Sequence, residues 1–151
     1  MPEITVPPHG PVPAHILVIG DFPTFDDERK QKLFSGQTGE EIHKMLHEAG
    51  FLASEIRFTT ILKSRPYSSQ LKYAWTKVAK DAKLCMPGVE KVAGAFASNA
   101  WKSGAYDIQL EIEQCNPNVI IALGDAVLWT LTKELSVDSW RGSLMRYPSV
   151  Y

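Results

Sequence analysis

The alternation of apolar and polar positions predicts a chain that switches between strands and helices. Three short apolar runs, 15–20, 56–62 and 119–123, have the length and the β-branched content of strands. The first run is apolar on both faces, as expected of a central parallel strand that helices cover from both sides. Helical patterns lie between the runs, so we expect an α/β domain with a largely parallel sheet.

The clearest helix is predicted to begin near residue 38. Thr38-Gly-Glu-Glu41 fits the capping box, in which a threonine and a glutamate each accept a free backbone N–H. Gly50 is well placed to end this helix. The predicted inward face comprises Ile42, Met45, Leu46 and Ala49. Residues 21–37 are expected to form a polar loop before it.

The remaining patterns are weaker. Helical spacing over 71–82 predicts a helix, which Met86-Pro-Gly88 ends before a second, weaker one. Further helices are expected over 106–114 and from Asp125, and a loop with an edge strand over 139–147. Residues 1–14 hold five prolines and predict an extended arm, followed by one domain over 15–151.

Composition narrows the class of protein only slightly. At 151 residues and 44% hydrophobic, the chain is long enough for one domain with a sizeable core. A net charge of −1 does not indicate a nucleic-acid binder, although a local basic face is compatible with it. Two cysteines are too few for a disulfide framework, and we find neither a signal peptide nor a membrane-spanning run. We therefore expect a cytoplasmic protein that has no contact with a membrane.

Candidate chemistry collects where the predicted strands end. Asp21, Asp26 and Asp27 follow the first strand, and the segments 60–66 and 124–126 follow the other two. In parallel sheets, ligands bind at the carboxyl ends of the strands, so these segments are expected to meet there. For Asp21 a role in ligand contact and a solvated turn remain equal alternatives, whereas Asp26 and Asp27 are expected to be solvated.

Five motifs in order resemble the uracil-DNA glycosylase superfamily, most closely its family 4 in the form found in phages. They are Gly20-Asp-Phe-Pro23, Leu33-Phe-Ser-Gly36-Gln-Thr-Gly39, Phe58-Thr-Thr60-Ile-Leu-Lys-Ser64-Arg-Pro66, Pro117-Asn-Val-Ile-Ile-Ala-Leu-Gly124 and Arg141-Gly142. The resemblance covers most of 15–147, with about twenty extra residues between 70 and 105 relative to the usual spacing. It implies a three-layer α/β/α fold with a mainly parallel four-stranded sheet, and we expect the C-terminal strand of that sheet to be absent from this chain.

The resemblance also implies roles for particular residues. Asp21 would be the catalytic carboxylate, which stabilises the cationic sugar or orients water as the N-glycosidic bond breaks. Base binding would fall to Phe22, Phe34 and Thr60, with Phe34 as the ring on which a flipped base stacks. Contacts to DNA phosphates would come from Gly36, Gln37, Thr38, Ser64, Arg65 and Arg141.

Several positions depart from the family pattern. Asp21 replaces a glutamate, Phe22 stands where a small residue is usual, and Thr60 replaces an asparagine that makes paired hydrogen bonds to uracil. The family's iron–sulfur cluster needs four cysteines, and Ser64 stands at one of those positions, so we expect no cofactor. The family's later His-Pro motif has no counterpart here, which indicates a piece of a longer protein or an altered activity.

Two hypotheses about function follow, and a third ranks behind them. The first is a DNA N-glycosylase or a weakened descendant of one. The second is a non-catalytic module that binds DNA or a partner, such as a phage DNA polymerase in the same chain or a separate one. A generic nucleotide-binding domain is disfavoured because Gly20-Asp-Phe-Pro23 lacks repeated glycines. A metal site at His43 and His47 is also disfavoured, and the lysines of 72–83 are expected to be a solvated face.

Overall fold

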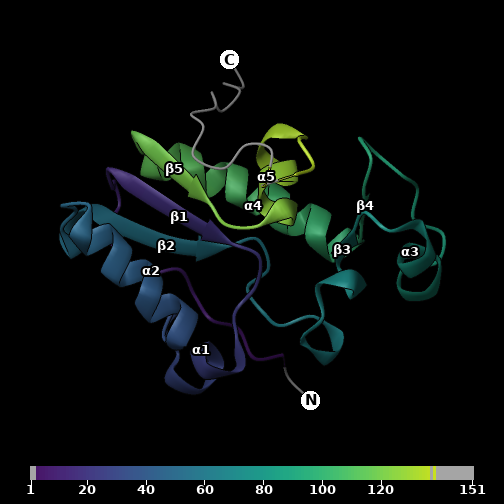
Figure 1. The fold of residues 1–151 in the computed structure, drawn as a ribbon, viewed down its shortest axis with the longest axis horizontal. Helices are drawn as coiled ribbons and strands as arrows, with labels where there is room; N and C mark the ends of the chain where they lie inside the picture. The colour runs from purple at the N-terminus through teal and green to yellow at the C-terminus, as the bar shows by residue number, and fades with distance from the viewer. Residues whose placement is uncertain (1–2, 137, 139–151) are drawn as a thin grey trace.

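A computed structural model describes residues 3–136 and 138 of the chain. Its central feature is a parallel sheet of β1 (Ile16–Gly20), β2 (Ile56–Thr60) and β5 (Val119–Ala122), in the order β2-β1-β5 (Figure 1). β1 lies in the middle, and all of its residues are buried. The three strands agree with the predicted runs to within two residues at each end. The described residues contribute three strands to this sheet, whereas we expected four.

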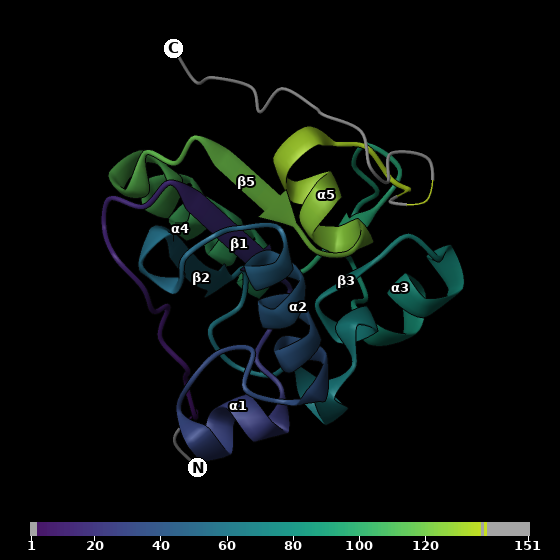
Figure 2. The ribbon, with the colours of Figure 1, turned by 60° about the vertical axis from the view of Figure 1, so that its left-hand side comes forward.

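Helices cover both faces of this sheet (Figure 2). Leu17 and Ile19 pack with α4 (Asn99–Cys115) and α5 (Asp125–Thr132), in a core that includes Trp101. Ile16 and Val18 point the other way, into a core with Leu46 of α2 (Gln37–Glu48). Because successive residues of a strand face opposite sides, the apolar run of β1 supplies both cores.

The segment expected to be a loop before α2 contains a short helix, α1 (Phe25–Lys30). The capping box occurs here, with Thr24 and Asp27 as its members, and α2 begins instead at Gln37 after an N-cap at Gly36. The prediction of a capping box at Thr38 was therefore wrong. Met45, predicted to face inward, is 66% exposed. The apolar spacing predicted the position of α2 but not the residue at which it begins.

The prediction over 71–82 was also wrong. The structure has the 3-10 turns η2 (Tyr67–Ser69) and η3 (Leu71–Tyr73), then β3 (Trp75–Thr76) and α3 (Ala79–Cys85). β3 pairs antiparallel with β4 (Phe96–Ala97), which lies where the second, weaker helix was expected. Trp75 is buried in the core, 6.0 Å from the ring of Trp129, so tertiary packing overrides the local spacing.

α4 begins at Asn99, well before the helix predicted over 106–114. Ser98 caps it by accepting the backbone N–H of Trp101, and Asn116 ends it in a left-handed conformation. One further 3-10 turn, η1 (Ala53–Glu55), precedes β2. The edge strand predicted over 139–147 lies outside the described residues. Among the residues that are described, no helix is long and apolar enough to cross a membrane.

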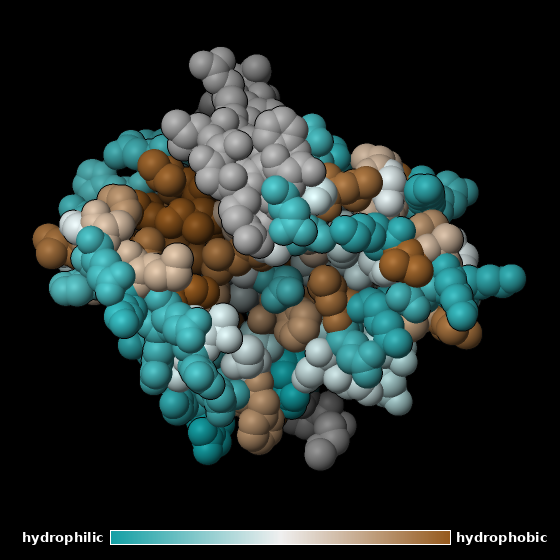
Figure 3. Space-filling view, viewed as in Figure 1, coloured by the Kyte–Doolittle hydropathy of each residue, from teal (hydrophilic) through white to brown (hydrophobic). Residues whose placement is uncertain are grey.

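The N-terminal segment lies along the free edge of β2. His9 forms an antiparallel bridge with Phe58, and the N–H of Val6 donates to the carbonyl of Lys63 at 2.8 Å. Val6 is fully buried in the core that faces α2. On the opposite edge, β5 is less covered, and Val119 is 49% exposed. Hydrophobic side chains gather between β5 and α2 on the face shown in Figure 3.

Candidate active site

Asp21 follows β1 directly and lies at the carboxyl edge of the sheet. Its carboxylate accepts the backbone N–H of Phe22 at 2.7 Å, and its carbonyl accepts the N–H of Leu62 at 2.9 Å. Burial raises the pKa of Asp21 above its usual value, although hydrogen bonds from backbone N–H groups oppose this effect. The contacts given above bring no cation to Asp21. A partly buried carboxylate of this kind is a candidate for acid–base chemistry.

The ring of Phe34 lies against the last residue of β1. A Cβ atom added at Gly20 would lie 3.1 Å from Phe34 Cζ and 3.7 Å from Thr60 Cγ2. Gly20 is also the register partner of Thr60 in the parallel pairing of β1 with β2. Phe34 and Thr60 therefore meet at Gly20, the residue that precedes Asp21 in the chain, and the absence of a side chain at Gly20 makes room for the ring.

Asp27 holds the backbone that carries Phe34. Its carboxylate accepts the N–H of Ser35 at 2.9 Å, the hydroxyl of Ser35 at 3.0 Å and the N–H of Thr24 at 3.2 Å. Asp27 is 4% exposed, so the prediction that it is solvated was wrong. These hydrogen bonds hold a turn in which Phe34 has a left-handed φ of 56°, a conformation that few residues with a side chain adopt. Asp26 is exposed and pairs with Arg29, as a solvated turn residue does.

Gly39 lets the start of α2 approach this turn. A Cβ atom at Gly39 would lie 2.1 Å from the carbonyl oxygen of Phe34. Gly36 caps the helix without a side chain, and Gln37 and Thr38 are exposed in its first turn. The three residues predicted to contact phosphate, 36–38, are thus at a helix N-terminus beside Phe34, where backbone N–H groups favour anions.

Thr60 is buried, and its hydroxyl donates to the carbonyl of Leu62 at 2.6 Å. The oxygen keeps lone pairs free, so toward a base this side chain can act as an acceptor. Phe22 is partly buried and packs against the core on the α4 side of the sheet, whereas Phe34 packs against the other core. The two rings predicted to bind a base therefore pack on opposite sides of the sheet.

Ser64 and Arg65 lie farther along the same edge, in contact with acidic residues. The hydroxyl of Ser64 donates to Glu3, and Arg65 Nε donates to Glu28. A second nitrogen of Arg65 donates to the hydroxyl of Ser69 at 2.7 Å. An open cleft of about 700 Å³ is lined by 64–66, 68–69, Glu28 and residues 3–4. This lining includes Arg65 but not Asp21, Phe34 or Thr60. Arg141 lies outside the described residues.

A model of the uracil DNA glycosylase superfamily matches residues 7–148 of the chain. The chain belongs to the uracil-DNA glycosylase superfamily. The match spans the sheet, both helical faces and every motif from which the resemblance was drawn. The α/β class and the parallel sheet agree with this membership. Proteins of this superfamily act on DNA.

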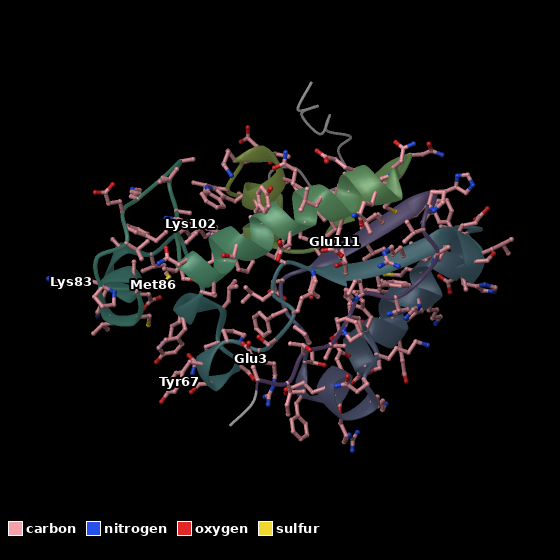
Figure 4. The ribbon with its side chains drawn as sticks, turned by 180° about the vertical axis from the view of Figure 1, so that it is seen from behind. Glu3, Tyr67, Lys83, Met86, Lys102 and Glu111 are labelled. Atoms are coloured by element: carbon pink, nitrogen blue, oxygen red, sulfur yellow. The ribbon has the colours of Figure 1, made fainter. Side chains whose placement is uncertain are left out.

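Sequence reasoning missed two side-chain groups of this superfamily member. Lys63 donates to Glu111 of α4 at 2.8 Å, and Glu111 also accepts the hydroxyl of Thr59 at 2.7 Å (Figure 4). This network fixes the chain just beyond Thr60 to α4. Lys63 belongs to the third motif and could have been noticed, but its partner on α4 carried no signal, since the two are 48 residues apart.

The second missed group surrounds Phe58. His9 stacks on the ring of Phe58 with 5.0 Å between centroids, and His43 approaches it at 4.7 Å. His43 is partly buried, so the expectation of a solvated face holds for His47 but not for His43. Burial and nearby cations lower the pKa of both His9 and His43. The i, i+4 spacing of His43 and His47 is compatible with a metal site, whereas in the structure the ring of His43 packs against Phe58.

The residues present do not fit the iron–sulfur cluster of family 4. The chain has two cysteines, and the cluster needs four thiolates. Cys115 is buried beside the carbonyl of Ala14, and Cys85 ends α3. Ser64, at a position that the family gives to cysteine, is hydrogen-bonded to Glu3. No group of three His, Cys, Asp or Glu residues suited to a metal occurs within the described residues.

Proposed function

We propose that this superfamily member binds DNA and hydrolyses the N-glycosidic bond of an extruded base, with Asp21 as the catalytic carboxylate. The observation that carries the proposal is the meeting of Phe34 and Thr60 at Gly20, with Asp21 as the next residue of the chain, at the edge where parallel sheets bind ligands. The ring supplies a stacking surface, the hydroxyl supplies an acceptor, and the carboxylate has a raised pKa.

The chemistry follows from the charges that develop. The bond between the sugar carbon and the base nitrogen breaks, and its electron pair leaves with the base, so the sugar becomes cationic. The Asp21 carboxylate stabilises this cation and accepts a proton from the water that attacks the sugar carbon. A carboxylate whose pKa is raised holds that proton better than an ordinary aspartate. A base that presents an N–H to Thr60 is held by a single hydrogen bond.

The test is excision of uracil from single- and double-stranded oligonucleotides. We expect Asp21→Asn to reduce the rate by about 10²- to 10⁴-fold, the usual contribution of a general base. Asp26→Asn is the matched control, because Asp26 is a half-exposed carboxylate of α1, five residues after Asp21, and it should retain the wild-type rate. Equal rates for wild type and Asp21→Asn would remove the catalytic role.

A second candidate function is a non-catalytic module of a replication protein. It is favoured by the Thr60 hydroxyl, which already donates to Leu62, and by the bulk of Phe22 next to Asp21. This reading predicts salt-dependent DNA binding without excision of any base. A phage-type family 4 identity and a phage DNA polymerase as partner belong to this proposal.

We also propose that the domain has the four-stranded, three-layer α/β/α arrangement of the family. β5 supports this, since within the described residues it forms the edge of the three-stranded sheet and carries partly exposed apolar residues, which a further strand would cover. Hydrogen exchange of the backbone amides of β5 checks the proposal. Slow exchange along the whole strand supports a fourth strand paired with β5, and rapid exchange of its outward-facing amides argues against it.

A further inference from the structure

The cleft beside Arg65 has a composition that suits a base better than a phosphate. Glu28 neutralises Arg65 from one side, and Glu3 contacts Ser64 from the other. The side chain of Glu28 is only 9% exposed, so this ion pair is largely withdrawn from water. A phosphate here would meet two carboxylates and one arginine, which is unfavourable electrostatically. A neutral ligand avoids this repulsion.

Two large aromatic rings are exposed beside this cleft. Phe25 is 62% exposed, and the guanidinium carbon of Arg65 lies 5.3 Å from the centre of its ring. Tyr67, between the lining residues 66 and 68, is 71% exposed and contacts Tyr73 edge-on at 4.8 Å. An edge-on contact leaves a ring face uncovered. Figure 4 shows Tyr67 and Glu3 on the same lower part of the molecule.

The backbone segment that leads into the cleft also runs beside the candidate active site. The N–H groups of Ile61 and Leu62 donate to the carbonyls of Gly20 and Asp21, so the chain leaving β2 runs alongside the catalytic carboxylate. The same stretch reaches Arg65 three residues later. A DNA strand with one base at Phe34 would therefore pass the cleft with a neighbouring nucleotide. Unpaired bases stack readily on exposed rings, whereas the bases of a duplex have no free faces.

We propose that this cleft binds an unpaired nucleobase next to the excised one, through stacking on Phe25 and Tyr67, and so selects single-stranded DNA. The proposal deepens the proposed function by naming its substrate class, and it rests on that function for the path of the strand. Arg65 is a positioning residue here, because its ion pair with Glu28 and its contact with Phe25 hold the ring in place.

The test measures binding of a short, fluorescently labelled oligodeoxythymidylate, which contains no uracil and needs no catalysis. Titrations by fluorescence anisotropy use the single strand and the same strand annealed to oligodeoxyadenylate, at several salt concentrations. The variants are Phe25→Ala, Tyr67→Ala and the double variant. Tyr106→Ala is the matched control, because Tyr106 is a similarly exposed ring, at 64%, on α4, an element that contributes no residue to the lining of the cleft.

We expect each cleft variant to lower affinity for the single strand by about tenfold, the usual effect of losing one stacked base, with no change for the duplex. The slope of log affinity against log salt should change by less than about 0.7, the contribution of one phosphate. Both rings are exposed, so the variants should fold, and circular dichroism checks this.

Three outcomes would overturn the proposal. They are single-strand affinities equal to that of Tyr106→Ala, an equal loss for single strand and duplex, or a slope reduced by a full phosphate contact. The last would mean that the cleft binds the backbone. A wild type that binds the single strand through these rings but excises no uracil would keep the cleft and refute the glycosylase, so the two failures are distinguishable.

Discussion

At the residue scale, the carboxyl edge of β1 concentrates functional constraints in two neighbouring positions. A side chain at Gly20 would press on the Phe34 ring, because its Cβ atom would lie 3.1 Å from Phe34 Cζ. Asp21 is partly withdrawn from water, which is unfavourable for a charged group. A fold that keeps a carboxylate in such a place sacrifices stability there, which is typical of a functional site.

Asp21→Asn should therefore leave the protein at least as stable as the wild type at neutral pH. Burial raises the pKa of Asp21, so the folded state favours its protonated form, and this contribution to stability is lost as pH rises through the folded pKa. Asparagine stays neutral at every pH. We expect an unchanged or higher melting temperature, by up to about 5 °C, in thermal unfolding at pH 7. A marked decrease would show that the charge stabilises the fold.

At the scale of elements, the turn from α1 to α2 is the device that presents Phe34. Its bonds are local: Asp27 joins Thr24 to Ser35, and Gly39 lets α2 lie against Phe34. The sequence displays this turn only as scattered polar residues, because its hydrogen bonds span up to eight positions without a fixed period. Periodicity could locate α2 but not the ring ahead of it.

Asp27→Ala should destabilise the protein by about 2–3 kcal/mol, since it removes the carboxylate of the capping box and leaves the part-buried N–H groups of Thr24 and Ser35 without their partner. Urea unfolding measures this change. Asp26→Ala, the neighbouring exposed carboxylate, should change stability by less than about 0.5 kcal/mol. Similar values for the two variants would contradict the role assigned to Asp27.

At the scale of the whole molecule, the N-terminal segment is joined to the sheet through a group of rings. His9 of this segment stacks on the ring of Phe58 in β2, and His43 of α2 packs against the same ring at a tilt. His9 Nδ1 is buried without a partner among the described residues. The charge of Lys32 lowers the pKa of both histidines, and that of Arg57 lowers the pKa of His9. The carboxylate of Asp27 raises the pKa of His9.

This arrangement makes stability depend on pH in a stated direction. The pKa of each histidine is lowered from 6.5, so the unfolded chain takes up protons first as pH falls. The contribution of the two rings is complete above 6.5 and is lost as pH falls through the lowered pKa values. We expect the unfolding free energy to decrease below pH 6.5, measured by urea titrations. A variant with His9→Phe and His43→Phe should show a flatter profile over the same range, and an unchanged profile would refute the assignment.

The sequence by itself determined the three parallel strands, the α/β class and the superfamily. Buried strands and motifs are patterns of consecutive residues, so they can be recognised without knowing which distant residues are in contact. It also supplied the proposal that Asp21, Phe34 and Thr60 form the site. Only the tertiary structure decided that Asp27 is buried, that Trp75 lies in a strand, and that Arg65 is paired with Glu28. The last two features depend on contacts between residues distant in sequence, whose energies outweigh local preferences. The position of Asp27 depends on hydrogen bonds that follow no fixed period, so local patterns do not show it.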